Sequence, residues 1–273
     1  MKLIFLDIDG TLTEPGTNVP PESAQRAIRA ARAAGNKVFL CTGRNYAMLS
    51  PLLEYGFDGF VGSAGGYVVC GGKVLYDHPM PHGLSDEILR VLHESGVHCT
   101  VEARDASYSD EDIVDFLAGV SGDGNSELVR WRRALEENLH IRPMHEYDGA
   151  PLYKVIFMCR EAGQLAAARA AYEKDFNFVV QDAFSKGCVN GEMINRAFDK
   201  GRGVRMIADE LGVSIEDTVG FGDSMNDWEM IETVGVGVCM ANGSPALQER
   251  SDMVCPAVSE DGIARAFEQL KLI

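Results

Sequence analysis

The sequence lacks several features that would each point to a particular class of protein. It has no apolar run near the roughly 20 residues that a membrane-spanning helix needs. The apolar stretch after Lys2 is cut by Asp7 after four residues, which is too short for a signal peptide. The seven cysteines are scattered and none forms a C-x-x-C pair, which disfavours a zinc knuckle or a dithiol redox site. We therefore expect a cytoplasmic protein with free, mostly buried cysteines.

Positive charge is also scarce. Lys and Arg number 25 against 41 Asp and Glu, which gives a formal net charge of −16 at pH 7. A polyanion such as DNA would be repelled at long range, so nucleic acid is not an expected partner. A small anionic substrate is compatible with this charge if cations gather locally around it. With 273 residues, of which 46% are hydrophobic, the chain is long enough for a large core or for two domains.

The most informative stretch lies near the start of the chain, where Leu3 to Leu6 run straight into Asp7. A short unbroken apolar run predicts a strand buried on both faces, as in a parallel sheet. Asp7 and Asp9 can converge at its C-terminal end, where open α/β sheets bind ligands and where Gly10 lets the backbone turn. Two close carboxylates repel each other, and a cation between them or a proton on one relieves the cost. A solvated turn is the alternative.

The next segments predict a βαβ unit. Residues 22–34 are strong helix formers, Gly35 follows where such a helix would end, and residues 37–41 predict a second buried strand. This strand ends in Thr42-Gly43-Arg44, which a parallel arrangement brings to the same edge as the two aspartates. A hydroxyl, a glycine and a guanidinium at that edge are suited to holding a phosphate, and an ordinary turn with a surface arginine is the alternative.

From about residue 82 the pattern of the sequence changes. Before this point, a helix is predicted over residues 45–55 and strands over 59–63, 67–70 and 73–76. After it, helices are predicted over residues 85–95, 126–139 and 161–174, and strands over 97–102, 152–158, 178–181 and 188–194. Residues 121–126 are rich in turn formers, and residues 141–147 are expected to be a loop. We expect residues 82–186 to form an inserted α+β domain, and residues 1–81 with 187–273 to form the α/β core.

Two further motifs follow the insert. Lys200 begins a predicted helix that Gly212 ends, and a lysine at a helix start opposes the helix dipole. Such a placement indicates another task, for example holding an anion, with a solvated lysine as the alternative. Residues 219–221 predict a strand that ends at Asp223, with Asp227 one helical turn beyond.

Three aspartates from two strand ends would then meet. Asp7, Asp9 and Asp223 make an oxygen-rich site of the kind that suits Mg²⁺, with simple helix capping by Asp223 as the alternative. Strands over residues 236–240 and 253–255 and a helix over 261–270 complete the chain. The predicted fold class is α/β, with a doubly wound, mostly parallel Rossmann-like sheet and an inserted α+β domain.

Four segments thus stand in a definite order: Asp7-Ile-Asp9-Gly-Thr-Leu, Thr42-Gly-Arg44, Lys200-Gly and Gly222-Asp-Ser-Met-Asn-Asp227. In this order the sequence resembles the haloacid dehalogenase superfamily of phosphatases. An insert between the second and third segments resembles the Cof-like branch, the sugar phosphatases with a large α/β cap. The resemblance covers nearly the whole chain. It implies a cap that closes over the site, Mg²⁺ as cofactor, and hydrolysis of small phosphorylated metabolites.

The resemblance also implies roles for the matching residues. Asp7 would be the nucleophile that forms an aspartyl-phosphate, and Asp9 would protonate the leaving alcohol and then activate water. Mg²⁺ would be bound by the Asp7 carboxylate, the Asp9 backbone carbonyl and Asp223. The residues implied in holding phosphate and substrate are Thr42, Lys200, Gly43, Arg44 and Asn226, with Asp227 in support; Asn242 matches a further family segment.

One segment departs from the family pattern, which often has Asn-Gly-Ala after the third strand. This chain has Ser63-Ala64-Gly65-Gly66 there, and Ala64 cannot donate the side-chain hydrogen bond that asparagine would make. Two other functions are compatible with the motifs. A phosphomutase would return the phosphoryl group to the sugar, and a catalytically silent binding protein would be expected to have lost at least one of the matching residues. A phospho-receiver domain is much shorter and has no insert.

Overall fold

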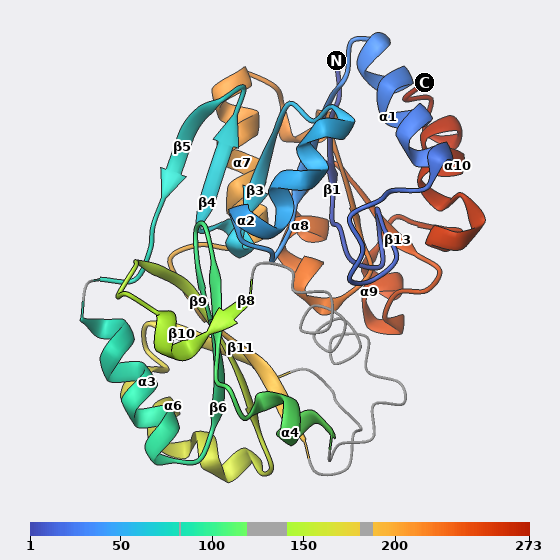
Figure 1. Cartoon of the computed structure of the whole chain (residues 1–273). Coiled ribbons are helices and arrows are strands. Elements are labelled where there is room, and N and C mark those ends of the chain that lie inside the picture. Colours follow the sequence, from blue (N-terminus) through green and yellow to red (C-terminus); the bar gives the residue numbers. More distant parts are fainter. Residues whose placement is uncertain (82, 119–140, 181–187) are drawn as a thin grey trace. The chain divides into compact units, whose positions relative to one another are not determined.

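The computed structural model describes residues 1–81, 83–118, 141–180 and 188–273 (Figure 1). The helix expected at residues 126–139 and the turn-rich segment at 121–126 lie outside them. The backbone contacts divide the chain into two units. Unit 1 comprises Met1–Arg44, Leu49–Asp77 and Phe198–Ile273, and unit 2 comprises Asn45–Met48 and His78–Ala197. Within the described residues, no helix combines the length and the apolar character that crossing a membrane requires.

Unit 1 is built on an eight-stranded sheet in the order β14-β13-β12-β1-β2-β3-β4-β5. Its strands are β1 (Leu3–Leu6), β2 (Lys37–Cys41), β3 (Gly59–Gly62), β4 (Tyr67–Cys70), β5 (Lys73–Asp77), β12 (Thr218–Gly222), β13 (Val236–Met240) and β14 (Met253–Cys255). The pairs β3–β4 and β4–β5 are antiparallel, and the other pairs are parallel. The doubly wound, mostly parallel sheet predicted from the sequence is therefore confirmed.

Helices cover both faces of this sheet. On one face lie α1 (Glu22–Ala33) and α10 (Gly262–Gln269), and on the other α7 (Lys200–Leu211), α8 (Trp228–Thr233) and α9 (Pro245–Arg250) (Figure 1). The central strand β1 shows why helices are needed on both faces of the sheet. Ile4 and Leu6 join the apolar cluster of α1 and α10, whereas Leu3 and Phe5 join that of α7 and α8. Side chains alternate across a strand, so an all-apolar strand is stable only between two layers.

One helix prediction near unit 1 is wrong, and Pro51 is the reason. A single helix was expected over residues 45–55, but the structure has α2 (Tyr46–Leu49) followed by a 3₁₀ helix at Ser50–Tyr55, with Pro51 as its second residue. Proline has no N–H for a helix already under way, and its ring disfavours the α conformation in the residue before it. The strands predicted over residues 67–70 and 73–76 are confirmed as β4 and β5, which pair antiparallel, with Gly71 and Gly72 at positive φ between them.

Unit 2 contains a six-stranded sheet in the order β10-β11-β9-β6-β7-β8. Its strands are β6 (His98–Ala103), β7 (Ser107–Ser109), β8 (Ile141–Pro143), β9 (Leu152–Cys159), β10 (Phe176–Val180) and β11 (Val189–Asn195). The described part of the unit includes the helices α3 (Leu84–Glu94), α4 (Ile113–Ala118) and α6 (Ala166–Tyr172). The strands β7 and β8 were not predicted, because three residues are too few to show a period of two.

The extent of unit 2 also differs from the expected insert. The strand β11 was expected in the core, but it pairs with β9 and β10 in the second sheet, so unit 2 reaches Ala197 rather than residue 186. The helix expected over residues 161–174 is shorter, since a 3₁₀ turn at Ala162–Leu165 precedes α6.

A buried ion network lies on the sheet of unit 2, across β6, β9 and β11. Lys154 Nζ is 2.7 Å from Glu192 Oε1 and 3.4 Å from Glu102 Oε2. The side chains of Lys154 and Glu102 are each 1% exposed. A single ammonium thus offsets the charge of two carboxylates that are largely shielded from water.

Replacing Lys154 with methionine is expected to lower the free energy of unfolding by about 3–5 kcal/mol, because the two buried carboxylates lose the cation that they share. Urea denaturation measures the change. Lys174→Met is the matched control, since Lys174 is exposed in the same unit and a surface substitution of this kind costs within about 0.5 kcal/mol. Equal midpoints for the two variants would contradict the compensating role of Lys154.

Candidate active site

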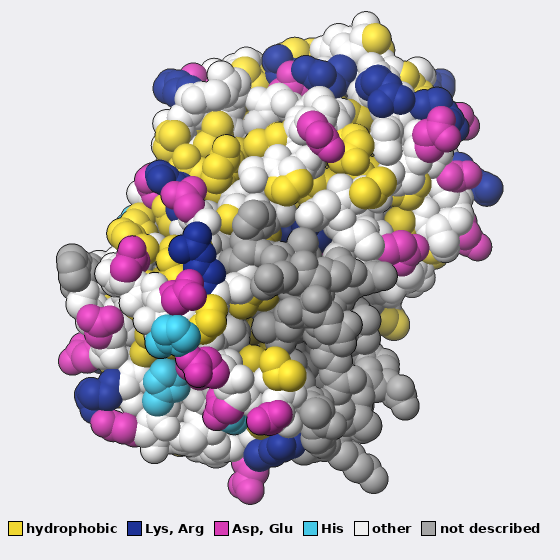
Figure 2. All heavy atoms as spheres, viewed as in Figure 1, with side chains coloured by type: hydrophobic (Ala, Val, Ile, Leu, Met, Phe, Trp, Pro, Cys, Tyr) yellow, Lys and Arg dark blue, Asp and Glu magenta, His cyan; other side chains and the backbone are white. Residues whose placement is uncertain are grey.

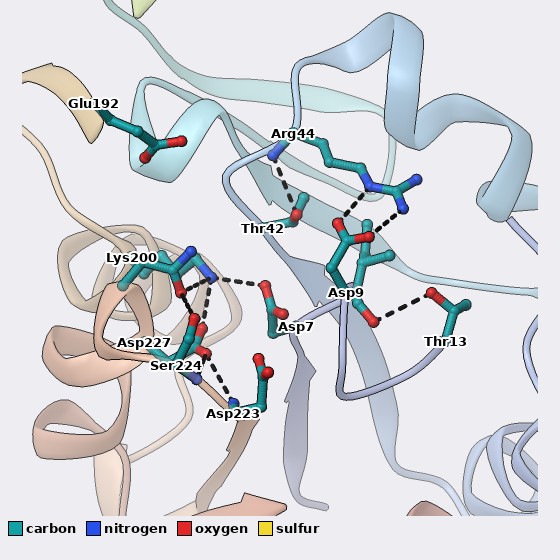
Figure 3. A network of polar contacts seen from close by, with 12 residues as sticks. Asp7, Asp9, Thr13, Thr42, Arg44, Glu192, Lys200, Asp223, Ser224 and Asp227 are labelled. Atoms are coloured by element: carbon teal, nitrogen blue, oxygen red, sulfur yellow. Dashed lines mark hydrogen bonds and ion pairs between the residues drawn. The ribbon is translucent and has the colours of Figure 1, made fainter. Parts of the chain in front are cut away.

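The candidate site lies in unit 1, at the C-terminal ends of three neighbouring strands (Figure 3). Asp7 follows β1, Thr42 follows β2 and Asp223 follows β12, and β1 lies between the other two strands. The backbone N–H of Asp7 still donates to Phe221 O at 2.9 Å, which fixes the end of β1 against β12. The three side chains therefore share the edge at which they were expected to meet.

Lys200 connects this edge to α7. Its Nζ lies 2.7 Å from Asp7 Oδ1 and 2.5 Å from Asp227 Oδ1, and its side chain is 1% exposed. This burial excludes the solvated surface lysine that was the alternative for this position. Burial lowers the pKa of Lys200, but the carboxylates of Asp227 and Asp7 raise it by more, so the pKa stands well above its ordinary value. Lys200 is thus held as a cation by two carboxylates.

Asp7 lies in surroundings that are short of positive charge. Burial raises the pKa of Asp7, and the charge of Asp227 raises it further, whereas Lys200 lowers it; the resulting pKa is about 7. One ammonium therefore does not offset the carboxylates that converge here. A further cation would stabilise the ionised form of Asp7.

Three carboxylates form a cluster that fits a divalent cation. Oxygen atoms of Asp7, Asp223 and Asp227 lie within 4.8 Å of one another. Gly10 permits this approach, because it has a φ of +81° and a Cβ there would stand 2.3 Å from Asp223 Oδ2. Carboxylate and carbonyl oxygens are the ligands that Mg²⁺ prefers. The chemistry of this donor set therefore fits Mg²⁺.

Asp227 also shapes the turn after β12. Its Oδ2 accepts hydrogen bonds from the backbone N–H groups of Asp223 at 3.0 Å and Ser224 at 3.2 Å, while Oδ1 contacts Lys200. Asn226 lies beside it, with its Oδ1 2.8 Å from Ser224 Oγ and 3.5 Å from Lys200 Nζ. Asp227 thus positions both the lysine and the loop that carries Asp223.

The side chain of Asp9 points toward Arg44 (Figure 3). Arg44 donates to both carboxylate oxygens of Asp9, from Nε at 2.8 Å and from Nη2 at 2.7 Å. The same guanidinium donates to Thr17 O at 3.1 Å and to Asn18 Oδ1 at 2.6 Å. Arg44 is only 2% exposed, so a buried guanidinium ties Asp9 to Thr17 and Asn18 of the same loop. The substrate contact expected for Arg44 stays a prediction.

The loop that contains Thr42 and Gly43 is held by main-chain hydrogen bonds from Ser63 and Ala64. These contacts were not predicted from the sequence. Thr42 O accepts from Ala64 N at 3.0 Å, and Arg44 O accepts from Ser63 N at 2.8 Å. Ser63 and Ala64 have φ values of 49° and 57°, which residues with a Cβ seldom adopt. Ala64 therefore contributes through its main chain. The only signal in the sequence was its departure from the family's asparagine, a residue that takes this conformation more readily.

Asn242 acts on the loop after β1. Its Nδ2 donates to Gly10 O at 2.8 Å, and its Oδ1 accepts from Val258 N at 3.4 Å. The side chain thereby ties the glycine turn beside Asp7 to the segment before α10. This contact gives Asn242 a positioning task within unit 1.

Comparison with known proteins gives concordant matches. A family model described as haloacid dehalogenase-like hydrolase matches residues 4–267. The putative phosphatase YkrA of Bacillus subtilis (strain 168) is 30% identical over 273 residues, which cover 100% of this chain and 98% of that protein. A solved structure of a hypothetical protein from Geobacillus kaustophilus HTA426 has a TM-score of 0.79 at 27% identity and covers 100% of this chain and 99% of that one. A HAD subclass IIB sugar phosphatase has the same fold, with a TM-score of 0.77 at 23% identity over 100% of both chains.

Proposed function

Since the chain belongs to the haloacid dehalogenase-like hydrolases and is a phosphatase, we propose that it hydrolyses small phosphate monoesters through an aspartyl-phosphate on Asp7, with Mg²⁺ as cofactor. Sugar phosphates are the proposed substrate class. The observation that carries the proposal is the buried lysine between Asp7 and Asp227, beside Asp223. It supports the proposal because a carboxylate, an ammonium group and a cluster of oxygens that could hold a metal ion lie at one edge of the sheet, as nucleophilic catalysis with a metal ion requires.

A bound Mg²⁺ would be held by Asp7, Asp223 and the backbone carbonyl of Asp9, and would offset charge on the phosphoryl oxygens. The protein's own groups supply the rest. Lys200 brings a fixed positive charge to the side of Asp7, and Thr42 offers a hydroxyl at the end of β2. Phosphoryl transfer depends mainly on positioning and on offsetting charge, which groups fixed in a buried edge provide without reorganisation.

The proposed reaction has two steps. In the first, a carboxylate oxygen of Asp7 bonds to phosphorus, the bond from phosphorus to the ester oxygen breaks, and Asp9 gives a proton to the departing alcohol. In the second, water bonds to phosphorus as Asp9 accepts its proton, and the bond to Asp7 breaks to release inorganic phosphate. Asp9 needs a proton for the first step, whereas its bidentate contact with Arg44 favours the ionised form. The proposal therefore requires Asp9 to leave Arg44 as substrate binds.

Replacing Arg44 with alanine is expected to lower kcat/KM by about a hundredfold, because the loop that carries Asp9 loses the guanidinium that holds Thr17 and Asn18. Arg44→Lys restores a charge without the planar fork and should recover only part of the loss. Steady-state kinetics at a temperature where the variants remain folded measure the effect. Arg29→Ala, an exposed position on α1, is the control, and wild-type kinetics in Arg44→Ala would remove Arg44 from the account.

The experiment that tests the function is release of inorganic phosphate from an aryl phosphate and from a panel of sugar phosphates, with Mg²⁺ or with a chelator. Release with Mg²⁺ that stops with the chelator supports a metal-dependent hydrolase. Undiminished release with the chelator would contradict the metal. Interconversion of sugar phosphate isomers without free phosphate would contradict hydrolysis and indicate a mutase.

A further inference from the structure

Unit 2 carries a second group of metal-ligating side chains, apart from the candidate active site. All six histidines of the chain lie between residues 78 and 145. His93 Nε2 is 3.0 Å from Asp110 Oδ2, and His98 Nδ1 is 3.0 Å from Asp112 Oδ1. Figure 2 shows histidine side chains beside acidic ones on the surface of the molecule. Neither pair has a task in the proposed phosphatase reaction.

These four residues come from three elements that other contacts already hold together. His93 lies in the last turn of α3, His98 begins β6, and Asp110 and Asp112 lie between β7 and α4. Asp110 is fixed by the backbone, since its Oδ2 accepts from Cys99 N at 2.7 Å and its own N–H donates to Cys99 O at 3.0 Å. The cluster therefore rests on ordered strand ends.

An open pocket of about 530 Å³ gives access to the cluster. His93, His98, Asp110 and Asp112 all line it, together with Gly96, Val97, Glu111 and Met144. A third histidine, His145, lies beside the pocket, because it contacts Glu111, which is one of the lining residues. A small hydrated cation thus has a path to every one of the four side chains.

We propose that His98, Asp110 and Asp112 bind a divalent first-row transition metal ion of the zinc class, and that His93 holds the Asp110 carboxylate in position for it. Two groups of potential ligand atoms, each within 4.8 Å of one another, share Asp110: one contains His93 and Cys99, the other His98 and Asp112. The proposal is independent of the phosphatase chemistry, because all of these residues belong to unit 2.

The observed spacing suits a metal. Nitrogen and oxygen ligands bound at about 2.0–2.2 Å stand roughly 3.0–3.5 Å from each other in octahedral or tetrahedral sites. The contact between His98 Nδ1 and Asp112 Oδ1, at 3.0 Å, already has this separation. An imidazole with two carboxylates favours zinc-class ions over Mg²⁺, which prefers oxygen, and the two negative charges balance a divalent ion. Plain ion pairs at the surface are the alternative that the test must separate.

The test is a zinc titration of the full chain against a chromophoric chelator, with Mg²⁺ in large excess to occupy the carboxylate cluster of unit 1. One zinc equivalent is expected on the wild type, with affinity at least a hundredfold weaker in the double variant His93→Ala, His98→Ala. Asp112→Asn should weaken it by about tenfold or more. His78→Ala, a histidine elsewhere in unit 2, and Asp223→Asn, in unit 1, should keep the wild-type affinity.

Co²⁺ in place of zinc provides a second readout, because its visible absorption reports nitrogen and oxygen ligands directly. The band is expected in the wild type and in Asp223→Asn, and is expected to be lost in the double histidine variant, whose circular dichroism should match the wild type. Zinc affinity in the double variant equal to that of the wild type would overturn the proposal. So would the loss of zinc binding in Asp223→Asn, which would assign the ion to unit 1.

Discussion

Replacing Asp7 with asparagine is expected to reduce turnover by at least about a thousandfold, because an amide does not replace the carboxylate nucleophile. The chain should remain folded, since asparagine has nearly the same shape and the backbone hydrogen bond from residue 7 to Phe221 O does not involve the side chain. Removing the charge also ends the repulsion from Asp227, which raises the pKa of Asp7 in the wild type. Phosphate release and the thermal midpoint, measured on the same preparation, check both parts.

Asp209→Asn is the matched control, because Asp209 is an exposed aspartate near the end of α7. It should retain wild-type turnover. Substantial activity in a well-folded Asp7→Asn variant would remove Asp7 as the nucleophile, while leaving the assignment of the chain to a phosphatase family untouched.

Replacing Lys200 with alanine is expected to lower the free energy of unfolding by about 3–5 kcal/mol in the absence of metal, because two buried carboxylates lose their shared cation. It should also lower kcat/KM by a hundredfold or more, since the positive charge beside Asp7 is lost. Mg²⁺ should raise the thermal midpoint of the variant by more than that of the wild type, because added positive charge then replaces the ammonium. Denaturation with and without Mg²⁺, together with steady-state kinetics, measures these effects.

Lys73→Ala is the control for this experiment. Lys73 pairs with Glu210 at 2.8 Å but its side chain is 64% exposed, and such a pair is worth at most about 1 kcal/mol. If Lys200→Ala had wild-type kinetics, Lys200 would have no place in the proposed reaction.

The framework of the site could be predicted because its signals are local in the sequence. The apolar runs before Asp7 and Asp223 predict buried strands, and parallel strands bring their C-terminal ends to one edge. Lys200 was recognisable because a lysine at a helix start opposes the helix dipole. Its burial could not be read from the sequence, since it depends on Asp227, 27 residues away.

The parts that escaped prediction depend on contacts between distant residues. The pairing of Asp9 with Arg44 joins residues 35 apart, and no local pattern encodes it. The left-handed conformation of Ala64 is set by backbone contacts with the Thr42 loop. The strand β11 was expected in the core because of its position in the sequence, and only its pairing with β9 and β10 assigns it to unit 2.

The most direct test of the central claim is chemical trapping of the phosphorylated enzyme. The enzyme is quenched during turnover of an aryl phosphate, treated with borohydride, which reduces an aspartyl-phosphate to homoserine, and digested for mass spectrometry. We predict homoserine at position 7, dependent on substrate and on Mg²⁺, and no such product at Asp9 or Asp223. An unmodified Asp7 in an enzyme that is turning over, or a trapped product at another residue, would contradict the proposed mechanism.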